Sequence, residues 1–99
     1  MSDPDVTVDG AFVPVPRPSV AAVELDGETV LLEQTSGAMH LLNPVGTAVW
    51  ASLDGGRTID ALVELLSDES GADPGTVRRD VTAFVHELAS AGLLVEGPP

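Results

Sequence analysis

The spacing of the apolar residues changes at Asn43-Pro44, and this change divides the chain into two kinds of local structure. Before this point, apolar and polar residues alternate as they do along half-buried strands. After it, apolar residues recur three or four positions apart, which is typical of amphipathic helices. Asn is a preferred helix N-cap and Pro is tolerated at the first helical position, so we expect the first helix to begin here.

Three short strands are predicted before this boundary. Residues 20–26 alternate regularly, and Asp26-Gly27 suits a tight hairpin turn in which both central residues need positive φ. Residues 28–34 form the returning strand, and the turn at 35–37 leads into a third strand at 38–42. The result is a three-stranded antiparallel meander in which the third strand lies at an edge.

Three helices are predicted after the boundary. The first ends at Asp54-Gly55-Gly56, and the second is capped by Thr58 and ends near Gly71. The third begins at Asp73-Pro74, repeating the cap-and-proline signal, and ends before Gly92. Residues 93–95 then either add a short strand or pack down as a hydrophobic lid. The sequence therefore predicts an α+β fold.

The two ends of the chain are predicted to lie outside this core. Residues 1–18 read as a flexible acidic arm, because Pro14, Pro16 and Pro18 disfavour a regular strand or helix. Residues 97–99 read as a tail. This leaves residues 19–96 as the one domain that a chain of this size is expected to form.

Composition excludes several classes of function. Sixteen Asp and Glu against four Arg give a formal net charge of -12, which disfavours nucleic acid and anionic membranes as partners. With no Cys and two His, we expect no metal site. There is no nucleophile–base pair or cofactor loop, so we expect no catalytic residue, no cofactor and no enzymatic activity. No apolar run is long enough to span a bilayer, and the acidic start is unlike a secretory signal, which predicts a cytoplasmic protein.

The segment LLEQTSGAMHLLNPVGTAVWASLDGGRTIDALVELL resembles the PqqD family. The shared features are a Leu-Leu strand, a short strand ending in Leu-Asn, the pattern Gly-x-x-x-Trp, a Gly turn and a Thr. The resemblance continues through Asp80 to Gly92-Leu93-Leu94. It implies a winged helix-turn-helix-like domain of the kind called a RiPP recognition element. Such a domain is not catalytic; it binds the leader segment of a ribosomally made precursor peptide and presents it to modifying enzymes.

The resemblance also implies where the leader peptide binds. In that family the leader is added as a strand beside the third strand, in a groove whose other wall is the third helix. The implied peptide-binding residues here are Ala38, Met39, His40, Leu41, Leu42, Val77, Arg78, Val81, Phe84 and Val85. The residue types agree with this, because the third strand lacks the Pro, Lys and acidic residues that commonly block an edge. Two other interpretations stay open: the apolar helix residues belong to the core, and Arg78 is a solvated surface charge.

The resemblance leaves open which enzyme receives the peptide. A leader peptidase of a lasso-peptide pathway is the preferred partner, and a radical SAM enzyme is the second choice. Two functions of other kinds remain as alternatives. One is a DNA-binding winged-helix regulator, which the net charge disfavours, and the other is a structural subunit that forms a homodimer through the edge strand.

Overall fold

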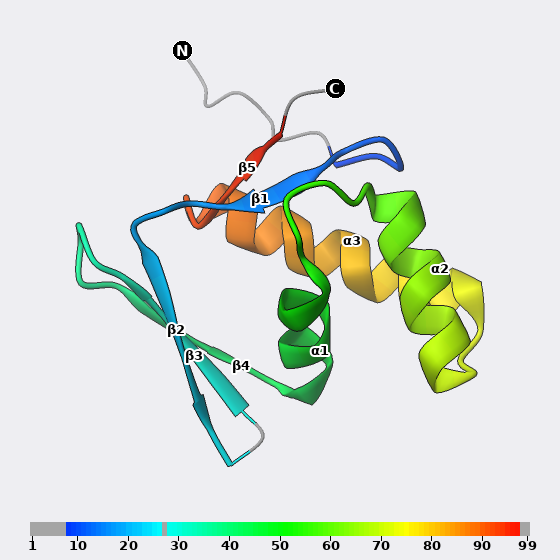
Figure 1. The fold of residues 1–99 in the computed structure, drawn as a ribbon, viewed down its shortest axis with the longest axis horizontal. Coiled ribbons are helices and arrows are strands. Elements are labelled where there is room, and N and C mark those ends of the chain that lie inside the picture. The colour runs from blue at the N-terminus through cyan, green and yellow to red at the C-terminus, as the bar shows by residue number, and fades with distance from the viewer. Residues whose placement is uncertain (1–7, 27, 98–99) are drawn as a thin grey trace.

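The computed structural model describes residues 8–26 and 28–97, which form two small antiparallel sheets and three helices (Figure 1). The strands are β1 (Pro14–Pro16), β2 (Val20–Leu25), β3 (Glu28–Glu33), β4 (Met39–Leu42) and β5 (Leu94–Glu96). The helices are α1 (Pro44–Ser52), α2 (Ile59–Ser70) and α3 (Pro74–Ser90). The predicted fold class, an α+β domain with a three-stranded antiparallel meander followed by three helices, is confirmed.

The meander has the strand order β2-β3-β4. The register pairs Val23 with Val30 and Leu31 with His40, so alternate residues of all three strands share a face. Leu31 is fully buried on the inner face, which α1 contacts. The hairpin between β2 and β3 includes Asp26 at φ 51°, as a turn with positive φ requires. Gly27, the other predicted turn residue, lies outside the described residues.

The predicted helix starts are confirmed by their caps. The side-chain oxygen of Asn43 accepts a hydrogen bond from the backbone N–H of Gly46 at 2.7 Å. Thr58 caps α2 through the N–H of Ala61, and Asp73 caps α3 through the N–H of Thr76, each at 3.1 Å. Each bond satisfies a backbone donor that the first helical turn leaves free, which fixes where the helix begins.

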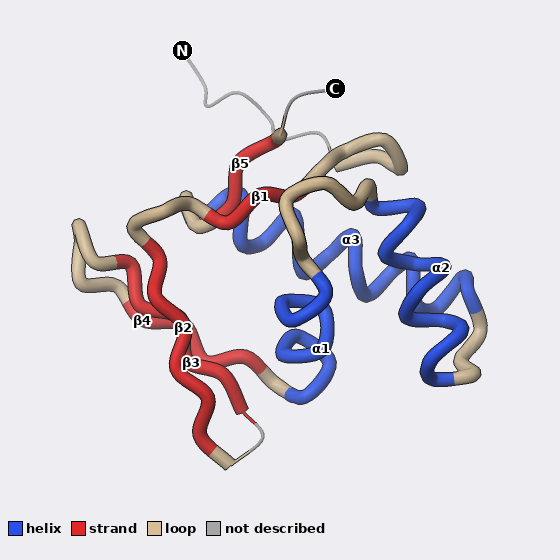
Figure 2. The backbone as a smooth tube through the Cα atoms, in the orientation of Figure 1, coloured by secondary structure: helices blue, strands red, loops and turns tan. Residues whose placement is uncertain are grey.

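The prediction of a flexible arm over residues 1–18 is wrong for the described part, residues 8–18. Pro14–Pro16 is strand β1 and pairs with β5 (Figure 2). Arg17 donates its N–H to the Leu93 carbonyl at 3.1 Å, and the Val13 carbonyl accepts from Gly97 N–H at 2.8 Å. The backbone groups of Val13, Val15 and Arg17 therefore point toward β5. The prolines lie between them, so their missing N–H groups all fall on the open side, where an edge strand needs no donor.

The same segment also accepts hydrogen bonds from the first residues of α2. The carbonyls of Gly10 and Phe12 accept hydrogen bonds from the N–H groups of Asp60 and Ile59, at 3.1 and 2.9 Å. Phe12 is only 3% exposed and joins the core between the helices and the sheets. That core consists of Phe12, Leu31, Leu42, Val49, Ile59, Leu62, Val63, Val81, Val85, Leu88, Leu93 and Leu94. The domain therefore begins well before residue 19.

None of the helices among the described residues is long and apolar enough to cross a membrane.

Candidate peptide-binding groove

The free edge of β4 is the first element of the site. Within the described residues β4 pairs with β3 on one side and with no strand on the other. The carbonyl of Ala38 accepts a hydrogen bond from Glu33 N–H at 2.8 Å, and His40 and Leu42 follow at alternate positions in register with β3. Because backbone groups alternate in direction along an antiparallel strand, those of Met39 and Leu41 point to the free side.

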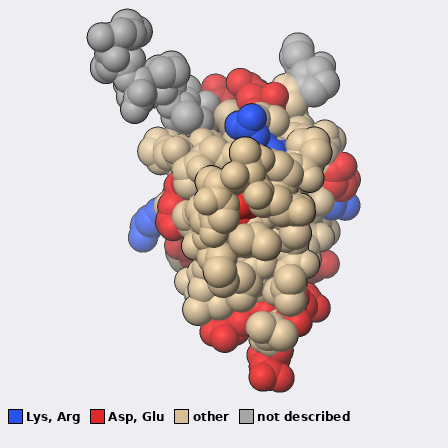
Figure 3. All heavy atoms as spheres, turned by 90° about the vertical axis from the view of Figure 1, so that its left-hand side faces the viewer, with Lys and Arg blue, Asp and Glu red and all other residues tan. Residues whose placement is uncertain are grey.

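The side chains of β4 alternate between two environments. Leu42 is buried and His40 is half-buried on the inner face, which α1 contacts. Met39 and Leu41 are 67% and 66% exposed on the outer face, where the exposed Val23 also lies. The side of the molecule with these strands shows few charged residues across its centre (Figure 3). The edge strand therefore presents apolar side chains beside free backbone groups.

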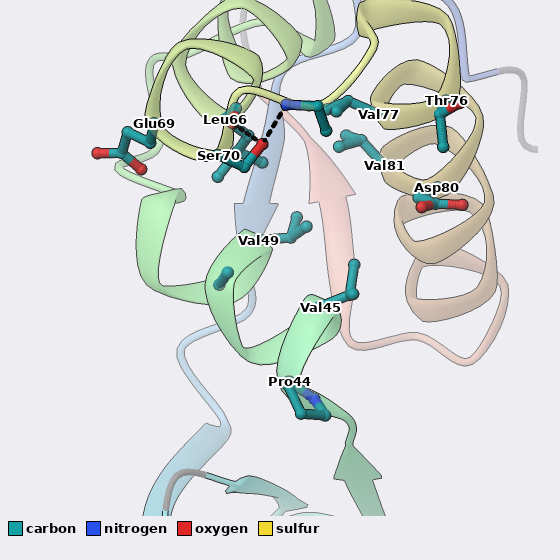
Figure 4. Close-up of a pocket in the computed structure, with 12 residues that line it drawn as sticks. Pro44, Val45, Val49, Leu66, Glu69, Ser70, Thr76, Val77, Asp80 and Val81 are labelled. Carbon is teal, nitrogen blue, oxygen red and sulfur yellow. Dashed lines mark hydrogen bonds between the residues drawn. The ribbon is translucent and has the colours of Figure 1, made fainter.

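Two neighbouring hollows lie between the helices, beside the helix α1 that directly follows β4. The larger has a volume of about 470 Å³ and lies between α1, the end of α2 and the start of α3 (Figure 4). Its apolar lining comes mainly from Val45 and Val49 of α1, Leu66 of α2 and Val77 and Val81 of α3. The smaller hollow, of about 290 Å³, lies between α3 and the start of α1, including its cap Asn43, which directly follows β4. Val45 and Asp80 line both hollows, so the two hollows adjoin along α3, and the pair is called the groove below.

One stripe of α3 faces this groove. Thr76, Asp80, Ala83 and Glu87 line the hollows and are spaced four, three and four positions apart, as neighbours on one helix face are. Phe84 adjoins this stripe, lines the smaller hollow and is half-buried. The helix thus divides its surface between the groove and the core.

The structure separates the helix residues predicted for the site. Val77 and Val81 line the larger hollow and Phe84 lines the smaller one, although Val81 is also a core residue at 1% exposure. Val85 is fully buried in the core and lines neither hollow. Arg78 donates a hydrogen bond to Asp60 of α2 at 2.7 Å and also lies outside both hollows.

Several groove residues are absent from the sequence prediction. Val45, in the first turn of α1, is 52% exposed and lines both hollows. Ala48 is likewise exposed and lines the larger hollow. The apolar residues of α1 extend beyond the part of the helix that packs on the core. Val49 is in the core, whereas Val45 in the first turn faces the groove. The sequence signal for these residues is an apolar stripe that begins directly after a helix cap, where that cap itself follows an edge strand.

The charges that line the groove are acidic. Asp80 and Glu87 of α3 and Glu69 of α2 line the hollows, and none of the four Arg does. Among the described residues, no group of three or more His, Asp or Glu side chains is placed to hold a metal ion. The arrangement consists of an open strand edge, an apolar groove and an acidic rim, which is suited to binding an extended chain.

The fold and groove together define a small α+β winged helix-turn-helix-like domain with an unpaired edge strand. The model of the family described as coenzyme PQQ synthesis protein D (PqqD) matches residues 28–94, and the chain belongs to this family. No curated protein matches the chain.

Three solved structures are similar to the chain. TbiB1, in complex with the TbiA(beta) leader peptide, is 32% identical, covers 80% of this chain and 92% of its own, and has a TM-score of 0.72. A lasso peptide synthetase B1 complexed with the leader peptide is 24% identical over 84% of this chain and 98% of its own, with a TM-score of 0.73.

The third is the PqqD truncation of Methylobacterium extorquens PqqCD, a stand-alone RiPP recognition element. It is 23% identical over 90% of this chain and 95% of its own, with a TM-score of 0.78. The fold is therefore that of RiPP recognition elements, as the sequence resemblance implied.

Proposed function

We propose that this protein is a RiPP recognition element that binds the leader segment of a ribosomally made precursor peptide. The leader is added as a strand to the free edge of β4 and places side chains in the groove beside α3. The observation that carries this proposal is that β4 has no strand partner on its outer edge among the described residues, while Asn43, the residue directly after β4, lines the smaller hollow beside α3. The leader-peptide complexes of TbiB1 and of the lasso peptide synthetase B1 support it by similarity.

The energetics require both the edge and the groove. Met39 and Leu41 offer about four outward backbone groups, and each new hydrogen bond contributes about 1 kcal/mol net. Ordering a flexible peptide costs about 1 to 2 kcal/mol per residue, so these bonds alone do not hold it. Burying about 300 Å² of apolar peptide surface adds about 7 kcal/mol. We therefore expect dissociation constants from tens of nanomolar to micromolar, with one or two apolar side chains as anchors.

The residues in this proposal have different roles. Ala38, Met39, His40, Leu41 and Leu42 form the strand that receives the peptide, and Val77, Val81 and Phe84 form the wall of the groove. Val85 acts from the core by supporting α3, because its side chain has no exposed surface. Arg78 acts by joining α3 to α2 through Asp60.

The protein's role in this proposal is delivery, and the chemistry belongs to a separate enzyme. A leader peptidase of a lasso-peptide pathway is the preferred recipient, which the similarity to a lasso peptide synthetase B1 supports. A radical SAM enzyme is the second choice, in keeping with the family. The cytoplasm, where precursor peptides are made, is the proposed location.

Titration of the isotope-labelled chain with synthetic leader peptides, including the TbiA(beta) leader, tests the proposal. NMR signals of the backbone amides of residues 39–42 and of residues 76–87 should shift together on binding. Binding that shifts only residues remote from both segments would place the peptide elsewhere. A panel in which no leader peptide shifts any of these amides would contradict the function.

The alternative homodimer would use the same strand edge, so a peptide bound there would compete with dimer formation. One measurement of mass therefore distinguishes the two functions. Sedimentation at increasing concentration should show a monomer whose mass is unchanged by peptide apart from the added ligand. A dimer that the peptide dissociates would assign the edge to self-association.

A further inference from the structure

Asp80 is the acidic residue placed most centrally in the groove. It lines both hollows, as Val45 does on α1. Among the described residues its carboxylate takes part in no hydrogen bond or ion pair, in contrast to Asp60, which is paired with Arg78. Asp80 is exposed in the free protein, and a strand that fills both hollows would cover its carboxylate and remove water from it.

Covering an unpaired carboxylate is unfavourable unless the ligand supplies a donor. A buried charge without a partner costs more than an unpaired neutral group, whereas a charge-assisted hydrogen bond to Lys or Arg is among the stronger contacts in proteins. Within the part of the chain that the structure describes, no Arg side chain lines either hollow. The compensating positive charge must come from the peptide.

A second carboxylate extends the same charge along the groove. Glu87 lies seven positions after Asp80 on α3, about 10.5 Å along the helix axis, and lines the smaller hollow. It is exposed and also makes no side-chain hydrogen bond or ion pair among the described residues. The acidic groove lies in a chain of formal charge -12, which attracts cationic peptides over a longer range.

We propose that the groove selects peptides in which a Lys or Arg lies within a few residues of the apolar anchor, with Asp80 as the main specificity-determining residue and Glu87 as the second. This inference rests on the proposed function and adds the class of peptide that the site takes. The apolar side chain occupies the larger hollow, and the basic side chain pairs with the carboxylate at its mouth.

Selection of a random 12-residue peptide library against the full chain tests the inference. Enriched peptides should carry an excess of Lys or Arg near an apolar residue. A synthetic member of that set should bind about tenfold more weakly when its basic residue is replaced by Gln. The Asp80→Asn variant should reduce this difference to less than about twofold, whereas Asp68→Asn, the same change at an exposed α2 position outside both hollows, should preserve it.

The outcomes separate this inference from the proposed function. Peptides that shift the amides of residues 39–42 without any excess of basic residues, or that bind equally well with Gln, would overturn the charge selection and leave peptide binding intact. A library from which no peptide shifts those amides would overturn both. The Glu87→Gln variant should weaken the preference less than Asp80→Asn does, and an effect confined to Glu87 would reverse the assignment of the main residue.

Discussion

Gly46 of α1 lies directly against the ring of Phe84 on α3, so closely that a Cβ atom at position 46 would be 2.9 Å from Cε1 of Phe84. Gly46 is buried, and Phe84 lines the smaller hollow beside it. The absence of a side chain at position 46 therefore sets how near α1 approaches α3. The Gly of the Gly-x-x-x-Trp pattern has a packing role at the side of the groove.

Replacing Gly46 with Ala should destabilise the protein, although Ala is favoured over Gly in a helix by about 1 kcal/mol. The added methyl group must displace Phe84 or move α1, and overpacking of this kind costs about 1 to 3 kcal/mol. Chemical denaturation measures the net effect. In a Phe84→Leu background the same change should cost less, because the clashing ring atom is removed. A Gly46→Ala variant as stable as the wild type would show that the contact is not restrictive.

Phe12→Ala should lower the free energy of unfolding by about 3 to 5 kcal/mol, since it removes a large side chain from the core. Val95→Ala, at a 40% exposed position of β5, is the control and should cost less than about 1 kcal/mol. Thermal and denaturant unfolding compare the two. Equal, small effects would mean that the segment before β2 does not belong to the folded domain.

Leu41→Pro should weaken leader-peptide binding by about tenfold or more, because it removes an N–H directed to the free edge. Ala22→Pro is the matched control on the opposite edge. Val23 pairs with Val30, on the side of β3 that faces β2, so Ala22 directs its N–H away from the sheet. Ala22→Pro should bind within about twofold of the wild type. Leu41→Ala separates loss of the side chain from loss of the donor, and equal affinities of both proline variants would exclude the β4 edge as the site.

Acidification should weaken the turn that leads into β4. Hydrogen bonds from Ser19 and from the backbone of Thr35 lower the pKa of Glu33 below its ordinary value of 4.5. The unfolded chain therefore protonates this residue at a higher pH than the folded chain does. Its contribution to stability is complete above pH 4.5 and is lost as the pH falls through the folded-state pKa.

An NMR titration of the Glu33 carboxylate carbon measures this pKa directly. In the Glu33→Gln variant, stability should fall less steeply on the acid side than in the wild type. Glu64→Gln, at an exposed position of α2, should leave the pH dependence of the free energy of unfolding as it is in the wild type. A Glu33 pKa at or above 4.5 would contradict the hydrogen-bonded arrangement.

The helices and the meander were predictable because their signals are local. Asn43, Thr58 and Asp73 cap the three helices at the positions that the sequence indicates. The alternation of residues 20–26 predicts the strand β2 but not its buried face, because Val23 and Leu25 are 49% and 58% exposed on the outer face while Leu31 is buried on the opposite face. The caps and the strand positions depend on residues only a few positions apart, so a single sequence contains that information.

The role of the proline segment was not predictable in this way. Whether Pro14 and Pro16 prevent a strand depends on which side of the strand is paired, and that is decided by β5 at the other end of the chain. The division of α3 is also a tertiary property: Val85 and Phe84 are adjacent in the sequence, yet one is in the core and the other lines the groove. Periodicity identifies an apolar face, but it does not say what covers each part of it.

Hydrogen exchange of individual backbone amides, with and without bound leader peptide, tests the central claim most directly. An added strand accepts hydrogen bonds from the N–H groups of Met39 and Leu41, so the exchange of these two amides should slow on binding. The amides of Ala22 and Glu24, which point outward from the opposite edge, should exchange at unchanged rates. Tight peptide binding without slower exchange at Met39 and Leu41 would contradict strand addition to β4.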